Sequence, residues 1–87
     1  MEGRKMIEVK EWFIDKAQDT ARRYNTYIDV YSRDENGTVE AKDGYLTVQV
    51  LEVLKETEKA IQAVLSTGEI VGSVNGWKTW IPKSVIK

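Results

Sequence analysis

The sequence has 87 residues, of which 41% are hydrophobic and 31% are charged. These proportions exclude a disordered chain and fit one small domain over residues 1–87 with a modest core. It contains no cysteine and no histidine, which removes disulfide frameworks, thiolate and imidazole catalysis and nearly all zinc and copper sites. We therefore expect no enzyme: no catalytic residues, no metal site and no cofactor.

The charge is unevenly distributed, although the net charge is only −1. Residues 26–58 carry three basic and eight acidic side chains, whereas residues 59–87 carry four basic and one acidic. This is either ordinary surface scatter or a polarised surface with one face for a partner. The start of the sequence has no apolar run of signal-peptide length, and no stretch reaches membrane-spanning length. We expect a cytoplasmic protein that does not bind membranes.

Residues 8–24 have the pattern of an amphipathic helix. Apolar side chains recur near a 3.6-residue period and would form one stripe; they are Val9, Trp12, Phe13, Ala17, Ala21 and Tyr24. Acidic residues near the start, and Arg22 and Arg23 near the end, suit the helix dipole. Asn25 suits the stop position.

From residue 26 the sequence changes to turns and β-formers. Residues 26–33 alternate, with Ile28 and Val30 on the face opposite two tyrosines, which predicts a strand. Asn36-Gly37 predicts a type I′ hairpin turn before a short return strand at 38–42.

Two further predictions concern this part of the chain. Asp43-Gly44 predicts a second tight turn. The four tyrosines predict a half-buried aromatic layer under the helix; they are Tyr24, Tyr27, Tyr31 and Tyr45.

Residues 45–66 fit two structures. Apolar side chains would share one face of a single helix; they are Leu46, Val50, Leu54, Ile61 and Leu65. However, the segment starts with strict alternation and is rich in β-branched residues, which favour strands. We favour two strands, 45–55 and 59–66, with a β-bulge where the alternation slips at Val50-Leu51.

The C-terminal segment again has turn and strand signals. Residues 66–69 predict a turn, and 70–74 a strand. Asn75-Gly76 predicts a type I′ turn before a last strand at 77–81. Pro82 has no N–H to donate, so it ends that strand or lies on a sheet edge.

Together these elements predict an α+β fold. A helix at about 8–24 packs on a small, curved antiparallel β-meander or partly open barrel. The β-rich part covers about residues 26–82 and has about five to six strands.

The last strand holds the candidate partner-binding residues, which are Trp77, Lys78, Trp80 and Lys83. Alternation places Trp77 on one face and Lys78 with Trp80 on the other. One tryptophan faces the core, and the second lies either under another element or on the surface, and the sequence leaves open which. A surface tryptophan flanked by lysines is typical of a protein-interface anchor and equally of a single-strand nucleic-acid binder.

Residues 56–87 resemble the ends of small uncharacterised phage, prophage and bacterial host proteins. The shared pattern is Thr-x-Lys-Ala, an alternating apolar strand, a turn and then Trp-Ile-Pro-Lys-Ser. The matching residues are Thr57, Lys59, Ala60, Trp80, Ile81, Pro82, Lys83 and Ser84. The resemblance implies strands over residues 59–66 and a mobile-element origin, and it carries no activity to transfer.

These observations predict a non-enzymatic module that binds a macromolecule. The favoured form is a phage or mobile-element accessory protein that binds a host or phage protein sterically. The alternatives are a single-stranded nucleic-acid binder using the C-terminal hairpin, and a structural module that self-associates as a homodimer through a strand edge.

Overall fold

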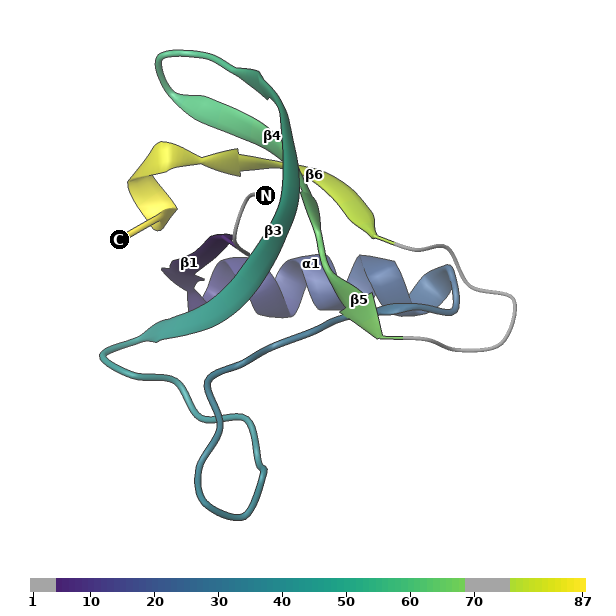
Figure 1. The fold of residues 1–87 in the computed structure, drawn as a ribbon, viewed down its shortest axis with the longest axis vertical. Coiled ribbons are helices and arrows are strands. Elements are labelled where there is room, and N and C mark those ends of the chain that lie inside the picture. Colours follow the sequence, from purple (N-terminus) through teal and green to yellow (C-terminus); the bar gives the residue numbers. More distant parts are fainter. Residues whose placement is uncertain (1–4, 69–75) are drawn as a thin grey trace.

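The computed structural model describes residues 5–68 and 76–87 (Figure 1). This part of the chain contains one α-helix, six strands and one 3₁₀ turn. In chain order these are β1 (Lys5–Lys10), α1 (Glu11–Arg23), β2 (Tyr27–Ile28), β3 (Tyr45–Glu56), β4 (Ala60–Leu65), β5 (Thr67–Gly68), β6 (Trp77–Pro82) and η1 (Lys83–Val85).

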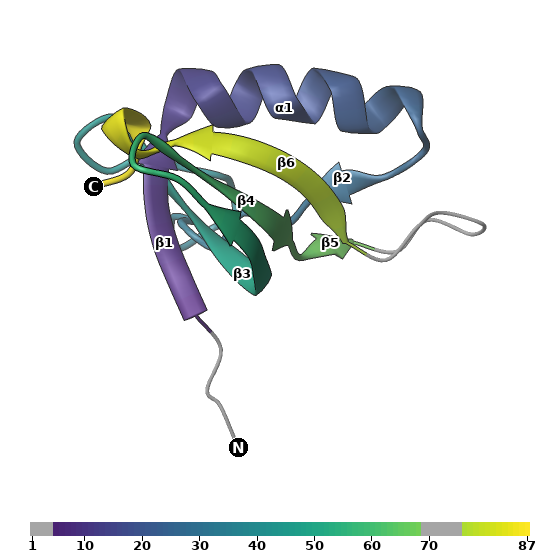
Figure 2. The same ribbon diagram turned by 90° about the horizontal axis from the view of Figure 1, so that it is seen from above.

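The strands form two antiparallel sheets. The larger has the order β1-β3-β4-β6, and the smaller pairs β2 with β5. Figures 1 and 2 show the long strand β3 curving strongly and α1 lying alongside β6. The predicted α+β fold, with an N-terminal helix on a curved antiparallel sheet, is confirmed; the sheet is not a closed barrel.

The curvature of β3 has a local cause. Its pairing with β4 shifts register between Val50 and Glu52, and again between Val53 and Lys55. Each shift adds an unpaired residue on β3, which bends the strand and increases its twist. The two strands and the bulge at Val50-Leu51 were predicted correctly. So was the last strand, which ends at Pro82.

The core lies between α1 and the sheet. Every element of the larger sheet contributes an apolar side chain to it, and α1 contributes Ile14 and Ala21. Its largest fully buried apolar side chains are Ile14, Ile28, Leu65, Ile81, Val9 and Val48.

The helix begins later than predicted. Residues 8–10 belong to β1, and the predicted stripe is correct only in part: Phe13, Ala17 and Ala21 pack in the core. Trp12 and Tyr24 are 57% and 63% exposed, whereas Ile14, outside the stripe, is buried. The early start was predicted because Val9, which is buried as a strand residue, was counted as the first residue of the helical pattern.

Residues 26–44 form less strand than predicted. Strand pairing is limited to β2 and isolated bridges, so the return strand at 38–42 was wrong. The turn at Asn36-Gly37 is not type I′, because only Gly37 has a positive φ. Its backbone is held instead by the Asp34 carboxylate, which accepts the N–H groups of Asn36 and Thr38. Asp43-Gly44 does have positive φ at both positions, 54° and 82°, as a type I′ turn requires.

Two smaller predictions were also wrong. The tyrosines do not form a layer under the helix: Tyr24, Tyr27 and Tyr31 are exposed. In the predicted turn at 66–69, Thr67–Gly68 is instead the strand β5, which pairs with β2. The predicted strand at 70–74 and Asn75 lie outside the described residues.

Candidate binding surface

Three of the four predicted partner-binding residues lie together. Trp77, Lys78 and Trp80 line a groove of about 240 Å³ between β6 and α1. The fourth, Lys83, begins η1 and does not line it; its ammonium forms an ion pair with Glu56 at 2.6 Å. The structure therefore separates Lys83 from the other three residues.

The two tryptophans have different environments. Trp77 is half-buried against the core, and its ring lies 5.6 Å from that of Tyr24, tilted by 43°. Trp80 is 44% exposed. The predicted alternation along the strand is confirmed, and Trp80 is the tryptophan on the surface.

The opposite wall of the groove comes from α1, which sequence reasoning did not include in the site. Its residues are Phe13, Lys16, Ala17 and Thr20. They recur at three- and four-residue spacing, so they share one helix face. Phe13 and Ala17 were assigned to the core stripe, and both do pack at its margin. The sequence feature that could have indicated this wall is the pair of polar residues Lys16 and Thr20, which flank the apolar stripe.

The backbone of β6 has one paired edge and one open edge. Among the described strands it pairs only with β4. The N–H of Lys83 donates to the carbonyl of Lys59 at 2.7 Å. Because bonded positions alternate in an antiparallel pair, this bond implies that Thr79 faces β4 and that the N–H and C=O groups of Lys78 and Trp80 point away from it.

The position of the only proline agrees with this phase. Pro82 lies two residues after Trp80, so it belongs with Lys78 and Trp80 to the positions whose backbone groups point away from β4. Its missing N–H therefore costs no hydrogen bond to β4. The open edge therefore offers its donors and acceptors at Lys78 and Trp80, beside the groove, and ends at Pro82.

The groove is positively charged. Lys16 and Lys78 line it, and no acidic residue does. Within residues 5–68 and 76–87 there are two ion pairs, Lys83–Glu56 and Lys87–Glu8, so neither groove lysine is neutralised by a described carboxylate within 4 Å. An acidic partner would supply the missing counter-charge.

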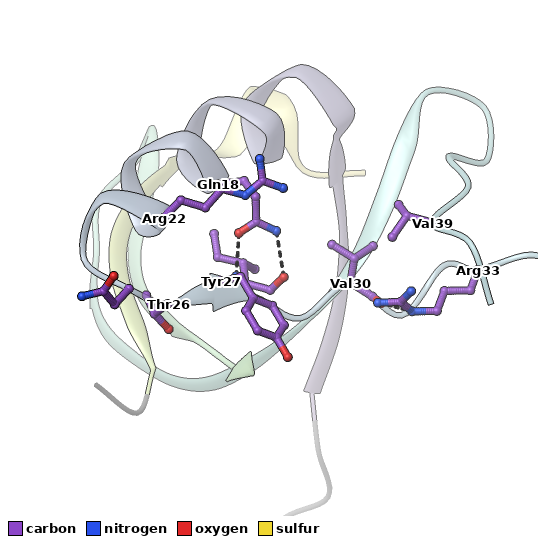
Figure 3. Close-up of a pocket in the computed structure, with 9 residues that line it drawn as sticks. Gln18, Arg22, Thr26, Tyr27, Val30, Arg33 and Val39 are labelled. Atoms are coloured by element: carbon purple, nitrogen blue, oxygen red, sulfur yellow. Dashed lines mark hydrogen bonds between the residues drawn. The ribbon is translucent and has the colours of Figure 1, made fainter. Parts of the chain in front are cut away.

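A second, larger cavity of about 410 Å³ lies on the other side of α1 (Figure 3). From α1 it is lined by Gln18 and Arg22, with Asn25 just beyond the helix. At 3.6 residues per turn, these positions lie roughly opposite the helix face that lines the groove. The buried face of α1 lies between the two, so the helix separates two cavities.

The described residues contain no group of three or more acidic side chains that could hold a metal ion. No helix in the described part of the chain is long and apolar enough to cross a membrane. Both cavities offer positive charge, aromatic rings and hydrogen-bond donors. Comparisons with family models, curated proteins and solved structures found no match to this chain.

Proposed function

We propose that this protein is a non-enzymatic binding module that captures an extended segment of a partner protein along β6. The segment adds a strand to the open edge and places side chains in the groove beneath α1. The observation that carries this proposal is the open β6 edge at Lys78 and Trp80, lying beside a positively charged aromatic groove.

Strand addition and the groove supply different parts of the binding. Main-chain hydrogen bonds give affinity, and the pockets beside an edge select alternate side chains. The lysines favour acidic residues in the partner, and Trp80 provides an aromatic anchor.

A protein partner would use both the open backbone edge of β6 and the groove, whereas a nucleic acid would use only the groove. Trp80 with Lys16 and Lys78 would also suit base stacking and phosphate contacts, but that mode makes no use of outward-facing strand groups. The partner we propose is a host or phage protein, which is the kind of partner expected if residues 56–87 have the mobile-element origin that their sequence pattern predicts. The lack of cysteine is consistent with a cytoplasmic setting.

The test is selection of 12-residue peptides from a random display library on the immobilised protein, followed by calorimetry. We expect enriched peptides to be acidic with alternating apolar residues. Trp80→Ala should weaken their binding by about 2–4 kcal/mol if Trp80 is a hot spot. Trp12→Ala is the matched control, because Trp12 is exposed but does not line the groove. Equal loss in both variants would contradict the proposal.

A backbone substitution distinguishes strand addition from side-chain binding. Lys78→Gln removes the positive charge and keeps the backbone N–H that points away from β4. Lys78→Pro removes the charge and that N–H, and it leaves the hydrogen bonds to β4 in place. Strand addition predicts that the proline variant remains folded and binds much more weakly than the glutamine variant.

The rival functions give other outcomes. Binding of a single-stranded dT12 oligonucleotide tighter than any selected peptide, with affinity falling steeply with salt, would establish nucleic-acid binding. A concentration-dependent dimer abolished by Lys78→Pro would establish self-association through the same edge.

A further inference from the structure

The second cavity has the dimensions of a small-molecule site. Its volume of about 410 Å³ falls within the usual range for ligand pockets, roughly 300–1,000 Å³. It lies between the C-terminal half of α1, β2 and the loop that follows β2. Figure 3 shows Arg22 extending over Gln18 from the helix, and Arg33 lying along the loop toward Val30.

The charge in this cavity is uncompensated. Arg22 and Arg33 line it, and no acidic residue does. The two ion pairs formed among the described residues involve neither arginine. Two carboxylates of the loop are engaged elsewhere: Asp29 accepts a bond from the Ser66 hydroxyl at 3.2 Å, and Asp34 accepts the N–H of Asn36 in its own turn.

Arg33 is held in place while keeping donors available. Its Nε donates to the Val30 carbonyl at 3.0 Å and its Nη1 to the Gly37 carbonyl at 2.7 Å. A guanidinium has five N–H donors, so these two bonds orient the group and leave the remaining donors for an anion. An arginine fixed in this way loses little side-chain freedom when it binds.

The rest of the lining suits the body of an organic molecule. Val39 and Tyr27 expose apolar surface there, being 43% and 39% exposed, whereas Ile28 and Val30 are buried. Thr26 also lines the cavity, and its hydroxyl is buried without a hydrogen-bond partner among the described residues. A buried polar atom that the protein leaves unpaired is rare.

We propose that this cavity binds a small organic anion. Arg33 holds its carboxylate or phosphate group, Arg22 adds positive charge from the helix side, and the side chains of Tyr27, Val30 and Val39 contact its apolar body. This site is separate from the β6 groove and does not depend on the function proposed there.

The test uses four probes in amide chemical-shift titrations of the whole protein. Phenyl phosphate and benzoate share an apolar body and differ in the anionic group, benzamide is the uncharged counterpart, and inorganic phosphate lacks the body. We expect one or both organic anions to saturate at low millimolar concentration, as suits fragments of about ten heavy atoms. The shifts should be centred on residues 26–30 and Arg33. Benzamide should bind at least about 10-fold more weakly.

Charge-removing variants locate the site. Arg33→Gln should weaken binding of the organic anion by about 5-fold or more, and Arg22→Gln should weaken it by a smaller factor. Arg23→Gln is the matched control, because Arg23 is an exposed neighbour that does not line the cavity, and Trp80→Ala tests independence from the groove. Both should bind as the wild type does.

Three outcomes would overturn the proposal. These are no saturable shift with either organic anion, equal binding of benzamide, or the same weakening in Arg23→Gln as in Arg33→Gln. Saturable binding of inorganic phosphate as tight as that of phenyl phosphate would also overturn the assignment of an apolar contact. The relative affinities of phenyl phosphate and benzoate identify the anionic group.

Discussion

Gln18 joins α1 to β2 through both atoms of its carboxamide. Its Nε2 donates to the carbonyl of Ile28 at 2.9 Å, and the N–H of Ile28 donates to its Oε1 at 2.7 Å. Ile28 is 1% exposed, so water cannot readily replace these bonds. β2 is only two residues long and pairs with β5 along one edge. At its other edge, the Gln18 side chain bonds the N–H and C=O of Ile28 in place of a neighbouring strand.

Replacing Gln18 by Leu should therefore destabilise the fold. Two backbone groups would lose their partners, and each such loss costs about 1–3 kcal/mol, so we expect the free energy of unfolding to fall by about 2–4 kcal/mol in urea titrations. Asp19→Leu changes an exposed neighbour and should stay within about 0.5 kcal/mol of the wild type. If Gln18→Leu is as stable as Asp19→Leu, the amide bonds contribute no stability.

At the scale of elements, the end of β3 is tied to the turn that follows β6. The Lys83 ammonium lies 2.6 Å from Glu56 Oε2. The pKa of Glu56 is lower than its ordinary value. The main cause is the hydrogen bond that Lys83 donates, and the second is the positive charge of Lys83. The pair is exposed, so salt screens it and its contribution to stability is small.

This ion pair predicts a pH dependence with a definite sign. Because the pKa of Glu56 is lower in the folded state, the stabilisation is present above the pKa of the unfolded chain and is lost as pH falls through the folded value. In Lys83→Met, an NMR titration of the Glu56 carboxyl should show its pKa rising toward the ordinary value. Lys59→Met, a nearby exposed lysine without this contact, should leave it unchanged. A Glu56 pKa unaffected by Lys83→Met would refute the coupling.

Elements defined by local chemistry were predictable from the sequence. Alternation predicted β3, β4 and β6, the break at Val50-Leu51 predicted the bulge, and Asp43-Gly44 predicted its turn. Elements that depend on partners distant in sequence were not: β1 is a strand because residues 45–50 pair with it. The turn at Asn36-Gly37 is a different case: it is local, but only Gly37 has the predicted positive φ, and Asp34 accepts the N–H groups of Asn36 and Thr38.

The same distinction applies to the candidate site. The sequence identified Trp77, Lys78 and Trp80 because they share one strand. It could not identify Lys16 as their neighbour, since that requires knowing that α1 lies beside β6. It grouped Lys83 with them by proximity in sequence, whereas η1 turns the chain toward Glu56.

For the molecule as a whole, the C-terminal tail fastens onto the first strand. Ile86 bridges to Val9, and the N–H of Lys87 donates to the carbonyl of Glu8 at 2.9 Å. Val85 is 4% exposed in the core. The two ends of the described chain therefore stabilise each other.

Deletion of residues 85–87 should be strongly destabilising. It removes the buried Val85 side chain and the backbone bond to Glu8, and we expect a loss of about 3–4 kcal/mol. That is a large part of the stability of a small domain, and thermal unfolding should show it directly. Lys87→Ala keeps the backbone bond and should cost less than about 1 kcal/mol. An unchanged melting temperature after the deletion would show that the tail does not hold the fold together.

The position of α1 between two cavities also leaves the lining of one of them without a tryptophan. Trp77 and Trp80 line the groove beside β6, and Trp12 contacts the groove residue Phe13 with ring centroids 6.0 Å apart. No tryptophan lines the opposite cavity, where the aromatic side chain is Tyr27. Emission excited at wavelengths that tyrosine does not absorb therefore comes from tryptophans on the groove side of α1 and from none in the lining of the other cavity. Tryptophan emission thus gives an optical signal for occupancy of the groove in the unlabelled protein.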